Sequence, residues 1–497
     1  MRRILTALLA ATMALAGPAW SALADDAPAK EDKAAIDLPP LPADKSVKQT
    51  MVLGGKTLTY TATVGTIPVR DPKGKKIGEV VFTAYTLDGP RDPKRPITFA
   101  FNGGPGAASV YLNLGAIGPK RIQFGAQGNS PSDAARLSDN PGTWLDFTDL
   151  VFIDPVGTGF SRSLVDEPET KKSFYGVKQD ITYLSRVVFD WLVKNDRMTS
   201  PKYVVGESYG GFRGPRIAHT LQTDLGVGVS GVVLVSPLLT SAGRQGLEVS
   251  PLPWMINLPS MAAANLERQG KLTPEAMADV EAYTRGDYML DLMKGADPAA
   301  IDRLTTKVSA LTGLDPKFVR RSGGRLETQA FLREVFRERG VLGSRYDSNV
   351  TAFDPFPYAP EQETNDPILD SIIAPTTSAI VDFTTHTVGW KPEGRYNALS
   401  NDVNRLWDRG RGADTESVTD LREAVANDPR LKVLIVHGYN DLSCPFFASR
   451  LIVDQMPTMG APGRVSLKVY PGGHMFYSRP DSQAAMRRDV MALYGVN

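Results

Sequence analysis

The strongest constraint on the fold of this chain is the stretch GESYG at residues 206–210. It lies between an apolar, strand-like run at Tyr203–Val205 and a helix-like run that begins near Phe212. A tight strand-to-helix turn forces its central residue into a strained conformation, and flanking glycines let strand and helix approach without side-chain clash. The hydroxyl of Ser208 would then stand at a helix N-terminus, whose dipole favours negative charge. The stretch predicts a nucleophilic serine; the alternative is a surface turn that happens to contain one.

Apolar strand-like runs alternate with helical runs on both sides of this turn. Apolar residues follow a helical period over Val177–Trp191. Strands are expected at Ile97–Phe101, Leu150–Ile153, Gly231–Val235, Val433–Val436 and Val465–Tyr470, after two hairpins that turn at Gly54-Gly55 and at Asp71–Gly74. This alternation predicts an α/β protein with a mostly parallel central sheet and helices on both faces. Together with the serine turn, it predicts the α/β-hydrolase fold.

The strand pattern is interrupted by a long insertion. Within it, Thr273, Asp297 and Asp315 each precede a proline, as residues that cap helix N-termini do. By analogy with this fold, a large helical insertion forms a cap over the active site. The expected organisation is a signal peptide at 1–24, a flexible linker at 25–48, an α/β-hydrolase core at 49–239 and 430–497, and a mainly helical cap at 240–429.

The N-terminus has the features of an export signal. Arg2 and Arg3 precede an apolar run at Ile4–Ala16 that is too short to span a bilayer, and Ala22 and Ala24 match a signal-peptidase site. The alternative is a membrane anchor or a buried helix. After cleavage no membrane association is expected. The single cysteine excludes an intramolecular disulfide, which favours a bacterial periplasmic or secreted protein.

Charge and motifs exclude several classes of partner. The chain has 56 basic and 55 acidic residues, a net charge of +1, which argues against nucleic acid as a partner. It has no H-E-x-x-H or C-x-x-C motif and no phosphate-binding glycine motif, so neither a metal nor another cofactor is expected. The sequence does not indicate the oligomeric state.

A nucleophilic serine needs a general base, and the chain has only four histidines. His474 follows the last strand, at the sheet edge where catalytic groups of α/β folds gather. Asp441 follows the preceding strand and would orient the imidazole. The order Ser208, Asp441, His474 is the one expected of this fold. The other histidines, His219, His386 and His437, are weaker candidates.

The glycine-rich stretch NGGPG at 102–106 directly follows the strand at Ile97–Phe101. Its backbone N–H groups are placed to stabilise the oxyanion of a tetrahedral intermediate. The N–H of Tyr209, next to the nucleophile, would be the second donor.

Five stretches in order resemble the serine carboxypeptidase family: NGGPG at 102–106, DPVGTGFS at 154–161, GESYGG at 206–211, GYNDLSC at 438–444 and GHM at 473–475. The resemblance implies Ser208 as nucleophile, Asp441 as orienting acid and His474 as base. It implies an oxyanion hole made by the N–H groups of Gly104 and Tyr209. It further implies that Asn102, the N–H of Gly103 and a protonated Glu207 bind the terminal carboxylate of a peptide substrate, which favours acidic pH.

The chain departs from the family pattern near that carboxylate site. Ala100 stands where the family usually has tryptophan, and Ala116 stands where it commonly has a glutamate that pairs with the one at position 207. Glu207 is therefore expected to lack a carboxyl partner. Arg213 could bind an anion instead, although an arginine on the helix surface is the plainer interpretation. Cys444 is expected to be a buried thiol.

The expected function is that of a serine carboxypeptidase that acts through an acyl-enzyme. The alternatives are another acyl-transfer enzyme with the same triad (aminopeptidase-like, esterase or acyltransferase) and a relative that binds ligands without catalysis.

Overall fold

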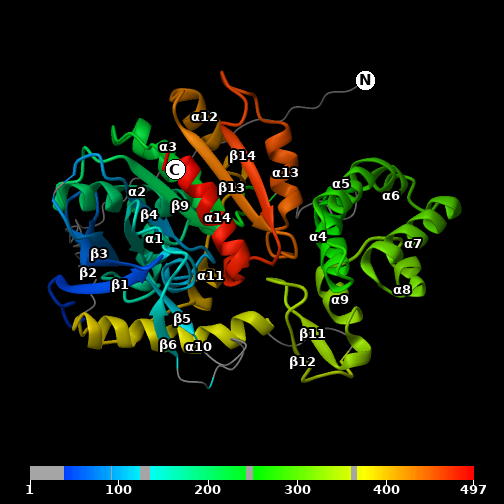
Figure 1. Ribbon diagram of the computed structural model, residues 1–497, viewed down its shortest axis with the longest axis horizontal. Helices are drawn as coiled ribbons and strands as arrows, with labels where there is room; N and C mark the ends of the chain where they lie inside the picture. Colours follow the sequence, from blue (N-terminus) through cyan, green and yellow to red (C-terminus); the bar gives the residue numbers. More distant parts are fainter. Residues whose placement is uncertain are drawn as a thin grey trace, which may run out of the picture. The chain divides into compact units, whose positions relative to one another are not determined.

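A computed structural model of the protein describes residues 38–90, 92–123, 132, 135–241, 250–359 and 366–496. Its centre is a twisted sheet in the order β1-β2-β3-β7-β4-β9-β10-β13-β14, with the short β8 paired to β3 (Figure 1). The strands are β1 (Lys45–Leu53), β2 (Lys56–Arg70), β3 (Lys76–Leu87), β7 (Asp149–Ile153), β4 (Ile97–Phe101), β9 (Lys202–Glu207), β10 (Gly231–Val235), β13 (Lys432–Gly438), β14 (Val465–Tyr470) and β8 (Arg162–Ser163). From β7 to β14 neighbouring strands run parallel, whereas β1, β2 and β3 are antiparallel.

Side chains of alternate residues in the central strands pack into two separate hydrophobic cores, one on each face of the sheet. Val204 and Val232 belong to the core beneath α2 (Val177–Lys194), α3 (Tyr209–Thr223) and α12 (Val418–Asn427). Val205 and Val233 belong to the core on the opposite face, which includes residues of α14 (Pro480–Leu493). This follows from the alternation of side chains along a strand. Because both faces are covered, β4, β7, β9 and β10 are buried along their whole length. The predicted mostly parallel sheet with helices on both faces is confirmed.

The helices of the core are α1 (Glu167–Phe174), α2 (Val177–Lys194), α3 (Tyr209–Thr223), α12 (Val418–Asn427), α13 (Phe446–Asp454) and α14 (Pro480–Leu493). The helices between β10 and α12 are α4 (Leu252–Arg268), α5 (Pro274–Tyr283), α6 (Met289–Met293), α7 (Pro298–Thr312), α8 (Pro316–Arg321), α9 (Thr328–Glu334), α10 (Pro367–Asp382) and α11 (Asn401–Leu406). Thr273, Asp297 and Asp315 accept hydrogen bonds from the first turns of α5, α7 and α8, so the predicted caps are confirmed.

The segment at 240–429 does not pack as one body. Helices α4 to α9 share their own apolar cluster, and α4 contacts α13 through a second cluster that includes Ala262 and Phe447. In Figure 1 these helices gather at one side of the sheet. Helix α12, by contrast, places Leu421 and Val425 in the main core against α3. We therefore propose that the cap proper comprises α4 to α9.

Two local features differ from the sequence predictions. Residues 45–48 belong to β1 rather than to the linker predicted at 25–48, because every residue from Lys45 pairs with a residue of β2. The insertion also contains an antiparallel pair, β11 (Val341–Gly343) and β12 (Thr351–Phe353), where no strand was expected. Both strands are too short for their side-chain period to be recognised in the sequence. A further antiparallel pair consists of β5 (Lys120–Gln123) and β6 (Arg136–Asp139).

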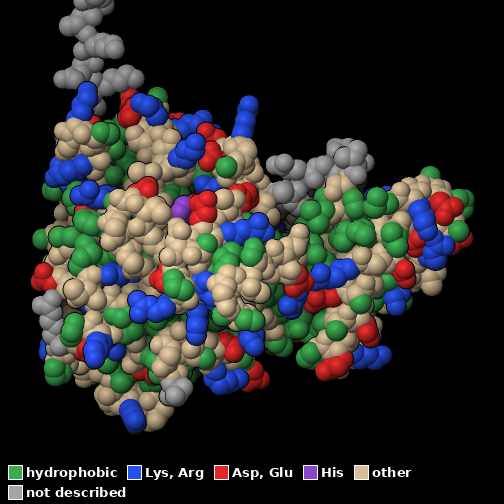
Figure 2. Space-filling model, turned by 90° about the horizontal axis from the view of Figure 1, so that it is seen from above, with side chains coloured by type: hydrophobic (Ala, Val, Ile, Leu, Met, Phe, Trp, Pro, Cys, Tyr) green, Lys and Arg blue, Asp and Glu red, His purple; other side chains and the backbone are tan. Residues whose placement is uncertain are grey.

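The predicted signal peptide at 1–24 and most of the linker lie outside the described residues. Within the described part of the chain, none of the helices has the length and apolar character needed to cross a bilayer. On the face shown in Figure 2, basic and acidic side chains are interspersed, in keeping with the net charge of +1.

Candidate active site

Ser208 occupies the turn between β9 and α3. Its backbone has φ 61° and ψ −121°, a region that residues with a side chain rarely adopt. An added Cβ on Gly206 would lie 1.9 Å from the carbonyl oxygen of Gly210, and one on Gly210 would lie 2.2 Å from the carbonyl oxygen of Phe101. The flanking glycines are therefore required by close backbone contacts, as the sequence predicted. The strain holds the half-buried Ser208 at the C-terminal edge of the sheet.

His474 and Asp441 meet in the loops that follow the adjacent strands β14 and β13. Nδ1 of His474 donates to Oδ2 of Asp441 at 2.7 Å, and both side chains are buried. The other carboxylate oxygen accepts backbone N–H groups of Ser443 (2.7 Å) and Cys444 (2.9 Å). Two backbone N–H groups thus orient the carboxylate of Asp441, and the carboxylate in turn orients the imidazole of His474.

The protonation of His474 is governed by burial and by Asp441. Burial alone would lower the pKa of His474, but the charge of Asp441 and its hydrogen bond outweigh this effect, so the pKa lies above the ordinary 6.5. Such an imidazole readily accepts a proton from a nearby hydroxyl group.

The end of β10 connects the serine turn to the histidine loop. The N–H of Ser208 donates to the carbonyl oxygen of Val235 (3.0 Å), and the N–H of Leu238 donates to that of Ser208 (3.1 Å). Between them, the hydroxyl of Ser236 donates to the carbonyl oxygen of His474 (2.8 Å). Ser236 has a φ of 43° and was not recognised in the sequence, since it ends an ordinary apolar strand. Among the described side chains no hydrogen bond joins the Ser208 hydroxyl to His474, and such bonds often tighten only when substrate binds.

The remaining histidines have other roles. Nε2 of His437 is 2.8 Å from the hydroxyl of Ser449, and complete burial lowers the pKa of His437 to about 4, so it stays neutral in the core. His219 pairs with Asp420 of α12 at 3.0 Å, and His386 is exposed. His474 remains the candidate base.

The glycine loop at 102–106 lies directly against the start of α3. An added Cβ on Gly103 would lie 2.4 Å from the backbone nitrogen of Tyr209 and 2.8 Å from the carbonyl oxygen of Glu207. Gly104, with φ 97°, is exposed beside this contact. N–H groups in the first turn of a helix have no acceptor within the helix, so that of Tyr209 is free of an intrahelical partner. The arrangement suits a pair of N–H donors from Gly104 and Tyr209.

Arg213 lies beneath this loop and is completely buried, which corrects the expectation of a surface arginine. Nη1 donates to the carbonyl oxygen of Asn102 (2.7 Å), and Nε donates to the buried carboxylate of Asp180 (2.6 Å). Its guanidinium lies over the rings of Tyr209 (5.0 Å) and Trp407 (5.8 Å). The helical period alone could not reveal this, because the partners come from other segments.

The DPVGTGFS stretch supports the glycine loop from its other side. Oδ1 of Asp154 accepts the N–H of Ser109 (2.8 Å), and the hydroxyl of Ser109 accepts the N–H of Asn102 (3.2 Å). Burial raises the pKa of Asp154 to about 7. This stretch therefore acts on the site through the loop that follows β4.

Glu207 is buried and has two neutral hydrogen-bond donors. Oε1 accepts the hydroxyl of Tyr477 (2.9 Å), and Oε2 accepts Nδ2 of Asn102 (2.7 Å). Burial raises the pKa of Glu207, although the charge of His474 and these hydrogen bonds act in the opposite direction. The partner that the sequence could not supply is Tyr477. The only sequence feature that points to Tyr477 is its position three residues after His474.

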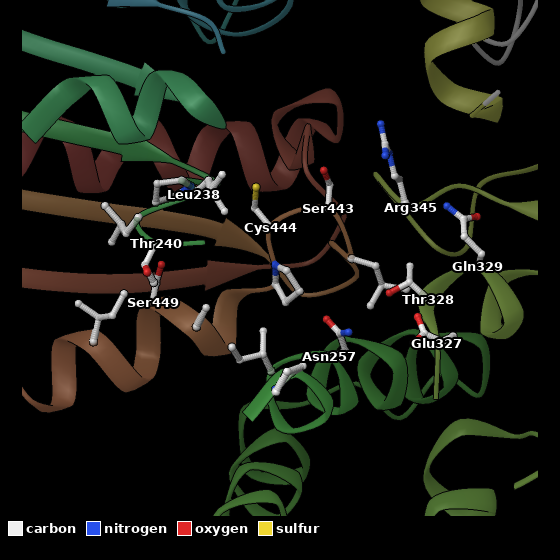
Figure 3. A pocket seen from close by; sticks show the side chains of 18 residues that line it. Leu238, Thr240, Asn257, Glu327, Thr328, Gln329, Arg345, Ser443, Cys444 and Ser449 are labelled. Atoms are coloured by element: carbon white, nitrogen blue, oxygen red, sulfur yellow. The ribbon is translucent and has the colours of Figure 1, made fainter. Parts of the chain in front are cut away.

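A cavity of about 290 Å³ opens next to these loops (Figure 3). The figure shows Cys444 and Ser443 on one wall, Leu238 and Thr240 on another, and Asn257 and Glu327 from the insertion opposite. Ser208 and His474 do not line it, but Leu238 is bonded to the serine backbone and Cys444 to Asp441. The cavity therefore borders the candidate catalytic residues. Cys444 is a buried thiol, as expected.

A segment of the insertion covers His474. The ring of Tyr346 lies edge-on to the imidazole, with centroids 5.1 Å apart. An added Cβ on Gly473 would lie only 1.9 Å from the carbonyl oxygen of Tyr346. Arg479 ties the segment in place by donating to Asp347 (2.8 Å) and to Glu267 of α4. The insertion thus contributes directly to the surroundings of the base.

The sheet order, the strained turn at Ser208 and the loops after β13 and β14 define the α/β-hydrolase fold. Within that class, residues 80–231 match the model of the serine carboxypeptidase family. This match confirms the resemblance seen in the sequence.

Two relatives with assigned names support the same family. The pheromone-processing carboxypeptidase KEX1 of Yarrowia lipolytica is 32% identical over 143 residues, which are 28% of this chain and 21% of that protein. Serine carboxypeptidase-like 50 of Arabidopsis thaliana is 30% identical over 159 residues, which are 31% of this chain and 32% of that protein. The chain therefore spans less than a third of the length of either relative.

Among solved structures, a proline iminopeptidase from Mycobacterium smegmatis aligns over 90% of this chain and 99% of its own, with a TM-score of 0.36 and 14% identity. A similarity of this size has no bearing on the activity. Among the residues that the structure describes, no three His, Cys, Asp or Glu side chains are grouped so that they could hold a metal ion.

Proposed function

We propose that this protein is a serine carboxypeptidase that releases C-terminal residues from peptides through an acyl-enzyme. The observation that carries the proposal is the buried hydrogen bond between His474 and Asp441, in loops beside the strained turn at Ser208. The match to the serine carboxypeptidase family over residues 80–231 supports the substrate class.

In the proposed reaction, Oγ of Ser208 attacks the carbonyl carbon of the last peptide bond while Nε2 of His474 takes the hydroxyl proton. The carbonyl oxygen becomes an oxyanion held by the N–H groups of Gly104 and Tyr209. His474 then gives its proton to the leaving amine as the C–N bond breaks. Water, activated by the same imidazole, hydrolyses the ester and regenerates Ser208. Asp441 stabilises the imidazolium in both steps.

In this proposal Asn102, the N–H of Gly103 and Glu207 bind the terminal carboxylate of the peptide. Two carboxylates cannot lie in contact without a proton between them, so Glu207 binds in its protonated form. The raised pKa of Glu207, which burial causes, favours that form.

The remaining parts of the proposal concern the surroundings of the site. The cap formed by α4 to α9 would restrict access to peptide chain ends, and the cavity beside Cys444 would receive a substrate side chain. Export to the bacterial periplasm or medium, with removal of residues 1–24, completes the proposal.

Three measurements test the assignment. Ser208→Ala should abolish hydrolysis and labelling by a serine-directed phosphonate, and unchanged hydrolysis would exclude the triad. Blocked peptides with a free or an amidated C-terminus should differ strongly in rate. Mass spectrometry of a digested peptide mixture then separates loss from the C-terminus from the alternatives: loss from the N-terminus, ester cleavage or acyl transfer. A protein that binds peptides without hydrolysing them would fail every one of these assays.

A further inference from the structure

The surroundings of Glu207 differ from a pair of carboxyl groups. Position 116, where the serine carboxypeptidase family commonly has a second glutamate, is a fully buried alanine. Instead, each oxygen of Glu207 already accepts one neutral donor, the hydroxyl of Tyr477 on Oε1 and Nδ2 of Asn102 on Oε2. The charged groups that act on Glu207 are His474, which favours its ionised form, and Asp441, which opposes it. Among the residues that the structure describes, no carboxyl group is hydrogen-bonded to Glu207 to share a proton with it.

The ring of Tyr477 packs directly against a glycine, Gly115. Tyr477 lies in the short helical turn η7 (Phe476–Ser478), directly after the loop of His474, and is buried. Its ring lies beside Gly115 in the π-helical turn η1 (Leu112–Ile117), where an added Cβ would come within 3.2 Å of Cε2. Gly115 does not have a positive φ, so the small size of glycine, rather than its backbone freedom, is what this contact uses.

Another tyrosine near Glu207, Tyr111, has a hydroxyl group that is not hydrogen-bonded to any residue that the structure describes. Tyr111 immediately precedes η1 and is 7% exposed, and its hydroxyl makes no hydrogen bond with any described residue. Burial raises the pKa of Tyr111, and the nearby groups of Tyr346 and Glu207 add to the effect. The N–H of Leu112, the next residue in the chain, donates to Oδ1 of Asn102 (2.9 Å), and Nδ2 of Asn102 donates to Glu207 (2.7 Å), so Tyr111 is anchored beside the same group of side chains. Buried hydroxyl groups without a partner are uncommon and call for an explanation.

We propose that the hydroxyl of Tyr111 donates a hydrogen bond to the terminal carboxylate of the peptide, and that Tyr477 positions Glu207 to bind the same group. Two tyrosine hydroxyls would then replace the second carboxyl group in this site. The inference rests on the proposed carboxypeptidase function. Tyr111 is a binding residue that contacts substrate, and Tyr477 acts only through Glu207.

The chemistry of the two donors supports this division. A phenol donates to a carboxylate without changing its own charge over the pH range in which enzymes work. The hydroxyl of Tyr477 instead stabilises the ionised form of Glu207, so it limits the pH range over which Glu207 stays protonated. Loss of the Tyr111 hydroxyl should weaken binding of the substrate carboxylate at every pH. Loss of the Tyr477 hydroxyl should also shift the pH at which the preference for free-acid substrates is half lost.

The test compares Tyr111→Phe and Tyr477→Phe with the wild type on one blocked dipeptide, supplied as free acid, as amide and as an alkyl ester. Tyr111→Phe should lower kcat/KM for the free acid by roughly 10- to 100-fold, mainly through KM, because a hydrogen bond to a charged group is lost. Rates on the amide and the ester should stay within about threefold of the wild type, since those substrates lack the carboxylate. Tyr477→Phe should shift the midpoint at which the preference for free acid disappears to higher pH.

Tyr288→Phe is the matched control. Its hydroxyl is also buried and donates to the carbonyl oxygen of Gly324 within the insertion, away from Glu207. It should leave the preference for free acid and its pH midpoint unchanged. Because the hydroxyl of Tyr111 makes no hydrogen bond within the described part of the chain, Tyr111→Phe should not lower Tm, and the ester rate on the same sample verifies folding.

The outcomes separate this inference from the function on which it rests. Equal wild-type rates on free acid and amide would contradict the carboxypeptidase function and the inference together. A wild-type preference that Tyr111→Phe retains in full would contradict the role of Tyr111 alone. A pH midpoint that Tyr477→Phe leaves in place would exclude Tyr477 as the residue that positions Glu207.

Discussion

Arg213 donates a hydrogen bond of 2.7 Å to the carbonyl oxygen of Asn102, so a buried cation of the serine helix holds the glycine loop that follows β4. The same guanidinium is paired with Asp180, and neither side chain is exposed. A buried ion pair contributes little net stability over apolar packing, but breaking it leaves an uncompensated charge. We therefore expect the pair to serve mainly to fix the position of the loop, and the single and double variants of Arg213 described next test this role.

Replacing Arg213 should separate stability from activity. Arg213→Met leaves Asp180 buried without its partner, and we expect a loss of about 3–5 kcal/mol in the free energy of unfolding. Denaturant unfolding measures this loss. The double variant Arg213→Met/Asp180→Leu should recover most of the stability, because both charges are then absent. Its hydrolytic rate should stay low, since the Asn102 carbonyl is still unsupported. A double variant with full activity would show that Arg213 is only structural.

Gly103→Ala should disable the glycine loop. The new Cβ would lie 2.4 Å from the nitrogen of Tyr209, so the loop must move away from the helix N-terminus. Loss of one oxyanion donor costs about 10²- to 10³-fold in kcat, and a similar loss is expected here for an ester substrate, whose KM should change little because it lacks the carboxylate that the N–H of Gly103 is proposed to bind. Gly228→Ala is the control, because an added Cβ there meets nothing within 4 Å. Steady-state kinetics that show equal effects of both substitutions would contradict the assignment.

The pH dependence of ester hydrolysis should report His474. The imidazole must be neutral to act as a base, and its pKa is raised above 6.5 because Asp441 outweighs the effect of burial. The rate should therefore fall as pH drops through a midpoint above 6.5. Asp441→Asn should move this midpoint to lower pH and lower kcat by about 10⁴-fold. A midpoint that is the same in both proteins would assign the titration to another group.

The preference for substrates with a free C-terminus should depend on the protonation of Glu207. It should decrease as pH rises, whereas the rate of ester hydrolysis increases. Burial raises the pKa of Glu207 above its ordinary 4.5, so the protonated form that binds a carboxylate persists above that pH. The ratio of kcat/KM for free acid over amide should decline as pH rises through the raised pKa. Glu207→Gln keeps a neutral donor at all pH values and should make this ratio independent of pH. A wild-type ratio that is already constant with pH would argue against a protonated Glu207.

Arg479 should couple the insertion to the base. Arg479→Gln removes its bonds to Asp347 and Glu267, and hydrogen exchange in residues 344–350 should become faster. A double-mutant cycle with Glu267→Gln should give a coupling energy of about 0.5–3 kcal/mol. Arg320→Gln, at an exposed pair with Asp302, is the control and should change neither exchange nor Tm by a measurable amount.

The sequence predicted the main strands and the candidate triad because these depend on local patterns. The runs at Ile97–Phe101, Gly231–Val235 and Val465–Tyr470 coincide with β4, β10 and β14. Each is bounded by residues that cannot continue the apolar run, so its ends are visible in the chain itself. Ser208, Asp441 and His474 follow such ends, where a parallel sheet gathers its loops. Their catalytic roles stay predictions.

The sequence could not reveal contacts that depend on the convergence of distant segments. Tyr477 reaches Glu207 from another loop, and Ser236 reaches the histidine loop from the end of β10. Arg213 has the period of a helix surface, yet the surface it faces is covered by Asp180 and Trp407. In each case nothing in the local sequence distinguishes the side chain, and its role depends on a partner from a distant segment.

The close contact between Gly473 and Tyr346 limits how this protein can be recombined with its relatives. Because the carbonyl oxygen of Tyr346 leaves no room for a Cβ at position 473, the loop of His474 and the segment around Tyr346 fit only as a matched pair. A chimaera that exchanges the insertion alone would place a foreign backbone against this loop and displace the imidazole. Exchanging the insertion together with the C-terminal loop should preserve the register of both, so the two segments form one unit of exchange although more than a hundred residues separate them in the chain.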